Sequence, residues 1–130
     1  MKMFMIVDDA PVIRKVANRI LSDLGFAVVE AADGFDALEK CRYSMPEVLI
    51  VDWDMPKMSG IEFIEEFRRI EGNEQTKLVY CTSEIMVSEM TRAKRAGANG
   101  FLMKPFNREI LIHKIQEVGI EIADKDSQAA

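Results

Sequence analysis

The stretch VLIVDWDMP at residues 48–56 decides the fold of this chain. Its first four residues are apolar, and a continuous apolar run of this length is typical of a strand buried on both faces, as in a parallel sheet. Asp52 follows the run directly and would lie at the carboxyl end of the strand, where open α/β sheets usually place their chemistry. The alternative is that Asp52 and Asp54 form only a solvated turn before Pro56. The rest of the chain has to decide between the two.

Strand-like and helix-like segments alternate five times along the sequence. Strands are predicted at residues 2–7, 26–30, 48–52, 77–82 and 100–103. Helices are predicted at residues 11–24, 34–45, about 60–70, about 85–96 and about 108–118. This alternation implies right-handed crossovers and one parallel sheet covered by helices on both faces, which is an α/β fold.

Several residues signal where the predicted helices begin. Ser59 and Glu62 have the spacing of a capping box, and Asp33 and Asn107 are suited to cap the second and fifth helices. In the second helix we expect three residues to face the core: Phe35, Leu38 and Cys41.

Length and composition indicate one ordinary globular domain. The 130 residues are 48% hydrophobic and 30% charged, with a formal net charge of −5. This charge argues against general nucleic-acid binding, which needs a basic surface. No apolar run has the length of a membrane span or the layout of a signal peptide, so we expect a cytoplasmic protein. The domain is predicted to cover residues 1–119, followed by a polar and disordered tail at 120–130.

Charged and hydroxyl side chains stand at the ends of four predicted strands. Asp8 and Asp9 follow the first strand, Asp52 ends the third, Thr82 ends the fourth and Lys104 follows the fifth. In a parallel sheet these ends lie on one edge, so the side chains converge. Clustered carboxylates repel one another unless a cation intervenes, and hard oxygen ligands suit Mg²⁺. A carboxylate nucleophile, a metal, an ammonium and a hydroxyl are the groups that phosphoryl transfer requires.

The motifs that carry this chemistry also carry a family resemblance. They are Asp8-Asp9, Asp52 within VDWDMP, MSG at residues 58–60, Thr82, and Lys104 within KPF. In this order, over about residues 3–118, they resemble a response-regulator receiver domain of the CheY-like type. The resemblance implies a flavodoxin-like, doubly wound, five-stranded parallel sheet with strand order 2-1-3-4-5 and five helices.

The resemblance also implies roles for the acidic residues. Asp52 looks like the phosphoacceptor. Asp8, Asp9, Asp52 and the backbone carbonyl of Asp54 look like the site of Mg²⁺, for which Mn²⁺ is an expected substitute. Asp54 and Glu84 occupy positions that tune the lifetime of the phosphate in this family.

Three further residues have implied roles in the response to phosphorylation. Thr82 is expected to hydrogen-bond the phosphoryl group, and Lys104 is expected to pair with it. Phe101 lies where the family has an aromatic switch, although it lacks the hydroxyl of a tyrosine.

The function implied is a stand-alone phosphorylation switch of a two-component system. The donor would be a sensor histidine kinase or a histidine phosphotransfer protein, and the output would be a protein effector that binds the face of the fourth helix, fifth strand and fifth helix. Chemotaxis, phosphorelay and cell-cycle control all fit such a switch. We expect no enzymatic activity beyond self-phosphorylation from small donors and autodephosphorylation, and either a monomer or a dimer promoted by phosphorylation.

Two other functions are open at this point. Asp52 and Asp54 form the D-x-D pattern of haloacid-dehalogenase-like phosphohydrolases, but here the pattern follows the third predicted strand rather than the first. A binding module that works without phosphorylation is the third possibility, and the complete set of acidic residues, Thr82 and Lys104 argues against it.

Overall fold

A five-stranded parallel sheet lies at the centre of the computed structural model, which describes residues 2–123. The strand order is β2-β1-β3-β4-β5, so the predicted α/β fold and its strand order are confirmed. The strands are β1 (Met3–Val7), β2 (Ala27–Ala31), β3 (Val48–Asp52), β4 (Lys77–Thr82) and β5 (Gly100–Met103).

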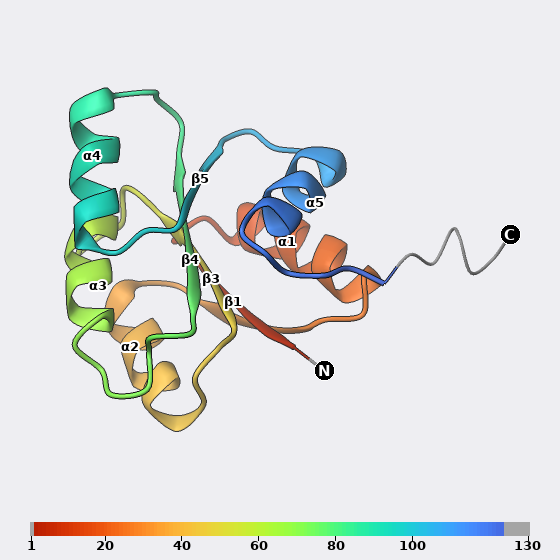
Figure 1. The fold of residues 1–130 in the computed structure, drawn as a ribbon, viewed down its shortest axis with the longest axis horizontal. Helices are drawn as coiled ribbons and strands as arrows, with labels where there is room; N and C mark the ends of the chain where they lie inside the picture. Colours follow the sequence, from red (N-terminus) through yellow and green to blue (C-terminus); the bar gives the residue numbers. More distant parts are fainter. Residues whose placement is uncertain (1, 124–130) are drawn as a thin grey trace, which may run out of the picture.

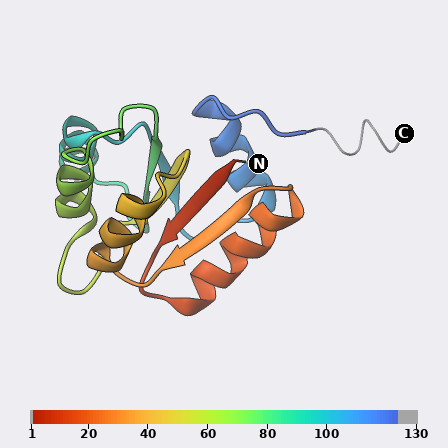
Figure 2. The same ribbon diagram turned by 90° about the horizontal axis from the view of Figure 1, so that it is seen from below.

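Five helices cover the two faces of this sheet within residues 2–123. They are α1 (Pro11–Asp23), α2 (Gly34–Tyr43), α3 (Gly60–Phe67), α4 (Val87–Ala96) and α5 (Arg108–Glu117). Helices α1 and α5 lie on one face, and α2, α3 and α4 lie on the other (Figures 1 and 2).

The central strand β3 divides its side chains between two apolar layers. Val48 and Ile50 belong to the layer beneath α1 and α5, whereas Leu49 and Val51 belong to the layer beneath α2, α3 and α4. All five residues of β3 are buried, which is why its sequence reads as a continuous apolar run. Asp52 continues the alternation of Val48 and Ile50, so its carboxylate is directed to the α1 and α5 side.

The predicted helix starts are present as hydrogen bonds. The Glu62 amide donates to Ser59 Oγ at 3.2 Å while the Ser59 amide donates to Glu62 Oε1 at 3.0 Å, which is the expected capping box. Asp33 accepts from the Asp36 amide at 2.8 Å, and Asn107 accepts from the Ile110 amide at 2.9 Å. The local sequence thus determines where α2, α3 and α5 begin.

The prediction that Phe35 faces the core is wrong. Phe35 is 55% exposed, because the buried face of α2 runs through Gly34, Ala37, Leu38 and Cys41. Phe35 lies beside that face and lines a groove of about 580 Å³ together with residues of α3.

Helix α4 begins two residues later than predicted, at Val87, which leaves Ile85 in an exposed loop.

The chain remains packed after α5 ends. Ile120 is buried, and its amide donates to the carbonyl of Ile115 at 3.1 Å. Residues 124–130 of the predicted tail lie outside the described residues, so the domain boundary after residue 119 stays a prediction. Within residues 2–123, no helix combines the length and the apolar character that a bilayer crossing requires.

Candidate functional site

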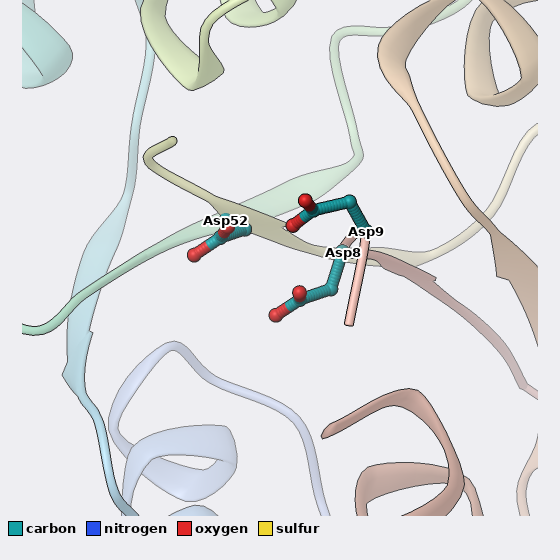
Figure 3. Close-up of side chains that lie close together, drawn as sticks. All are labelled: Asp8, Asp9 and Asp52. Carbon is teal, nitrogen blue, oxygen red and sulfur yellow. The ribbon is translucent and has the colours of Figure 1, made fainter. Parts of the chain in front are cut away.

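Three carboxylates converge at the carboxyl edge of the sheet. Asp8 and Asp9 follow β1, and Asp52 ends the neighbouring strand β3 (Figure 3). One ligand oxygen of each residue lies within 4.8 Å of the others. Asp8 and Asp52 are buried, whereas Asp9 is exposed at the entrance. We call these three residues the acid cluster, and the topology assembles it as predicted for parallel strands.

Lys104 joins the two buried members of the acid cluster. It follows β5, and its Nζ lies 2.7 Å from Asp8 Oδ2 and 2.7 Å from Asp52 Oδ1. Burial lowers the pKa of Lys104, but its hydrogen bonds to Asp52 and Asp8 outweigh that effect and raise the pKa above its usual value. The ammonium therefore stays positively charged at neutral pH, between Asp8 and Asp52.

The acidity of Asp52 is strongly perturbed. Burial raises the pKa of its carboxyl group to about 6, and the charges of Asp8 and Asp9 act in the same direction, while the hydrogen bond from Lys104 opposes them. One ammonium does not neutralise three neighbouring carboxylates. The site therefore retains excess negative charge at neutral pH.

This pKa predicts how the stability of the metal-free protein depends on pH. The folded protein takes up a proton at Asp52 near pH 6, whereas the unfolded chain does so only near pH 3.8. Folding is therefore favoured as the pH falls through 6, and the contribution of Asp52 between pH 8 and pH 5 is about 1 kcal/mol. Urea unfolding at both pH values, in the parent and in Asp52→Asn, isolates this contribution. An equal change in both proteins would contradict the raised pKa.

The donor set of the acid cluster fits a hard divalent cation. Carboxylate oxygens are the ligands that Mg²⁺ prefers, and the exposed position of Asp9 leaves room for water ligands. The carboxylate of Asp8 is held in place, since its Oδ1 accepts a hydrogen bond from the Ala10 amide at 2.9 Å. The acid cluster could thus hold a metal, and the predicted contribution of the Asp54 carbonyl stays a prediction.

Thr82 lies at the end of β4 with its hydroxyl group engaged in its own loop. Thr82 Oγ1 donates to the carbonyl of Glu84 at 3.1 Å and accepts from the Glu84 amide at 3.2 Å. The side chains of Asp54 and Glu84 are exposed. If the Thr82 hydroxyl donated to a group bound at Asp52, it would give up its hydrogen bond to the Glu84 carbonyl.

Phe101 contacts the core through a second aromatic residue. Its half-buried ring meets the buried ring of Tyr80 edge-on, with 6.3 Å between centroids and 86° between planes. The Tyr80 hydroxyl donates to Glu89 Oε1 at 2.7 Å, which links β4 to α4. Burial and the neighbouring Glu89 carboxylate raise the pKa of Tyr80. Phe101, β4 and α4 therefore form one connected unit beside the site.

Gly60 allows α3 to begin directly against the site. A Cβ atom at this position would lie 2.5 Å from the carbonyl oxygen of Asp52 and 3.0 Å from the Cα of Trp53. Only glycine permits this approach, and the Gly60 amide donates to the Trp53 carbonyl at 3.1 Å. The glycine of the MSG motif therefore holds the backbone that carries Asp52.

Arg14 and Glu30 were missed by the sequence analysis, although both are close to the site. Arg14 Nη1 donates to the carbonyl of Asp8 at 2.7 Å, and Arg14 Nε donates to Glu30 Oε1 at 3.1 Å. A signal was present, because Arg14 has the helical spacing of Ala17 and Leu21, which are the buried residues of α1. A charged residue on an apolar helix face is expected to have a partner.

Comparison with known proteins gives a consistent result. Residues 4–116 match the family described as "Response regulator receiver domain". The chemotaxis protein CheY of Pseudomonas aeruginosa is 34% identical over 115 residues, which cover 88% of this chain and 93% of that protein. The chemotaxis protein CheY1 of Helicobacter pylori is 33% identical over 116 residues, covering 88% of this chain and 94% of that protein.

A solved structure extends the similarity to the fold. The chemotaxis protein CheY4 of Vibrio cholerae superposes with a TM-score of 0.88 at 36% identity, covering 91% of this chain and 98% of that chain. These similarities do not favour the phosphohydrolase alternative for Asp52 and Asp54.

Proposed function

The chain belongs to the response regulator receiver domain family, and from this membership we propose that it is a phosphorylation switch whose acceptor is Asp52. Receiver domains of the CheY type are signalling switches rather than classical enzymes, and they imply a phosphodonor protein and a downstream effector. The observation that carries the proposal is the position of the Lys104 ammonium, 2.7 Å from oxygens of both Asp52 and Asp8 at the edge of the acid cluster.

The reaction is a transfer of one phosphoryl group to a carboxylate. An oxygen of Asp52 attacks the phosphorus atom of a phosphohistidine or of a small donor such as acetyl phosphate. The bond from phosphorus to the donor breaks, and the donor leaves with the electron pair, as acetate in the second case. Lys104 pairs with a phosphoryl oxygen, and Asp8 and Asp9 would hold Mg²⁺. When bound, the metal supplies positive charge to the phosphoryl oxygens.

The proposed response begins at Thr82. A phosphoryl group on Asp52 offers strong acceptor oxygens to the Thr82 hydroxyl, which now donates to the Glu84 carbonyl at 3.1 Å. When the Thr82 hydroxyl exchanges the Glu84 carbonyl for a phosphoryl oxygen, the loop before α4 is released. Phe101 moves with it, because its ring packs against Tyr80 of β4. The exposed acids Asp54 and Glu84 then set the phosphate lifetime by orienting or repelling the attacking water.

The proposed output surface is the face formed by α4, β5 and α5. Between β5 and α5 it carries a groove of about 460 Å³ whose lining includes Phe101, Met103, Ile110 and His113. The curated relatives are named as chemotaxis proteins, which favours chemotaxis over a phosphorelay or cell-cycle output. The proposed location is the cytoplasm, and the proposed donor is a sensor histidine kinase or a histidine phosphotransfer protein. The protein is proposed to be a monomer, or a dimer that forms on phosphorylation.

The direct test is phosphorylation by a small donor. We expect Mg²⁺ to change the fluorescence of Trp53, which is half-buried and adjacent to Asp52. Acetyl phosphate should then add the mass of one phosphoryl group, and Mn²⁺ should replace Mg²⁺. Intact-mass spectrometry without any adduct, at saturating metal and donor, would contradict the proposal. Turnover of p-nitrophenyl phosphate that is lost in Asp54→Asn would favour the phosphohydrolase instead.

A further inference from the structure

We propose that Arg14 is a positioning residue for the metal site, because it ties the peptide between Asp8 and Asp9 to Glu30 of β2. The proposal rests on the proposed function insofar as it takes the acid cluster to be the metal site. Arg14 does not touch the metal or the phosphoryl group in this scheme. It acts through the backbone that carries the two carboxylates.

The contacts of Arg14 form a bridge from α1 to two segments of the sheet edge. Helix α1 runs alongside β1 and β2 (Figure 2). Arg14 is half-buried in this helix. Nη1 donates to the carbonyl oxygen of Asp8 at 2.7 Å, and Nε donates to Glu30 Oε1 at 3.1 Å. The side chains of Arg14 and Glu30 are only 15% and 16% exposed. The guanidinium makes the two contacts from different nitrogens, Nη1 and Nε, which are held in one rigid plane, and a lysine ammonium offers only one nitrogen.

Glu30 is itself held from several directions. Two part-buried hydrogen bonds hold it, from Asn18 to Oε2 at 2.8 Å and from Lys40 to the backbone carbonyl at 2.7 Å. Lys15 adds only an exposed contact at 3.0 Å. Glu30 is therefore a fixed anchor rather than a mobile surface acid. The orientation of the Arg14 guanidinium follows from that anchor.

Asp8 is consequently restrained at each of its polar groups. Its amide donates to the carbonyl of Ala31 at 3.1 Å, its carbonyl accepts from Arg14 and its carboxylate pairs with Lys104. The carbonyl of Asp8 and the amide of Asp9 belong to one planar peptide group. Fixing the carbonyl therefore also fixes the direction in which the chain continues to the exposed Asp9.

Positioning and simple electrostatics predict opposite results for the loss of Arg14. A cation close to a metal site repels the metal, so removal of its charge alone would strengthen Mg²⁺ binding. Loss of a positioning contact instead weakens binding, and removal of groups that orient metal ligands typically costs 10- to 100-fold in affinity. The sign of the change in the Mg²⁺ dissociation constant therefore separates the two explanations.

The experiment compares Arg14→Met, Arg14→Lys and Lys15→Met with the parent protein by Mg²⁺ titration, followed by Trp53 fluorescence and by calorimetry. We expect the dissociation constant to rise about 10-fold in Arg14→Met. Arg14→Lys should recover part of this loss, because it keeps the charge and one of the two contacts. Lys15→Met is the matched control, since Lys15 pairs with the same Glu30, is 72% exposed and is expected to leave affinity within about twofold.

A second measurement uses the metal-free proteins. Amide hydrogen exchange at Ala10, whose amide donates to Asp8 Oδ1 at 2.9 Å, should be about 10-fold faster in Arg14→Met than in the parent and unchanged in Lys15→Met. Unchanged exchange, or Mg²⁺ binding in Arg14→Met that is as tight as in the parent or tighter, would overturn the role of Arg14. If the parent itself binds no Mg²⁺, the metal site fails; if the parent binds and Arg14→Met binds equally well, only this inference fails.

Discussion

Asp52→Asn is expected to abolish phosphorylation by acetyl phosphate completely. The amide is nearly isosteric with the carboxylate but is a poor nucleophile. Asp52 is the one member of the acid cluster that β3 contributes, and the proposal assigns the other two to the metal. Intact-mass spectrometry should detect one phosphoryl adduct on the parent and none on the variant. The fluorescence response of Trp53 to the donor should disappear with the adduct.

Asp54→Asn provides the matched control for this experiment. Asp54 is two residues further along and exposed, so the same substitution there changes the charge of the chain equally without touching the acid cluster. We expect Asp54→Asn to accept one phosphoryl group and to change only the rate of its loss. An adduct of equal yield on Asp52→Asn would refute the assigned acceptor.

Arg68→Ala is expected to destabilise the fold strongly. Arg68 caps the end of α3, and its guanidinium donates to the carbonyl of Gly97 at 2.8 Å, to that of Thr76 at 3.1 Å and to that of Asn73 at 3.0 Å. It also lies over the ring of Phe67 at 5.5 Å. Removing it leaves several half-buried carbonyl groups without their charged donor, which should lower the free energy of unfolding by about 3 kcal/mol.

The neighbouring Arg69 is the control for Arg68. It is 74% exposed and pairs with Glu66 across one turn, so Arg69→Ala should change stability by less than about 0.5 kcal/mol. Urea unfolding of both variants measures the difference directly. A loss below about 1 kcal/mol in Arg68→Ala would mean that water replaces the guanidinium at these carbonyl groups.

The strands and the starts of α2, α3 and α5 were predictable because they depend on local signals, whereas the strand order followed from the family resemblance. The apolar run before Asp52 indicated a strand covered on both faces, and the Ser59 and Glu62 pair located the start of α3 correctly. The prediction that Phe35 faces the core was wrong because the spacing of apolar residues does not give the width of the buried face of a helix. In α2 that face is narrow and reaches only Gly34, Ala37, Leu38 and Cys41.

The acid cluster was predictable for a different reason. Parallel strands bring their carboxyl ends to one edge, so Asp8, Asp52 and Lys104 had to approach one another once the fold was known. The contacts of Arg14 with Asp8 and Glu30, and that of Tyr80 with Glu89, depend on how helices settle on the sheet. No local spacing encodes that docking, so these partners became visible only in three dimensions.

The two short contacts of Lys104 give the resting site its own counterion. A divalent cation that enters would compete with the ammonium for the two oxygens that it pairs with, so its entry would include an exchange of cations. The free energy of metal binding would then be the difference between the association of the metal and that of the Lys104 ammonium with the same carboxylates. A phosphoryl donor that draws the ammonium toward itself releases Asp8 to the metal, and by reciprocity the metal favours the donor. Metal and donor would therefore bind cooperatively, with the displaced lysine as the coupling element.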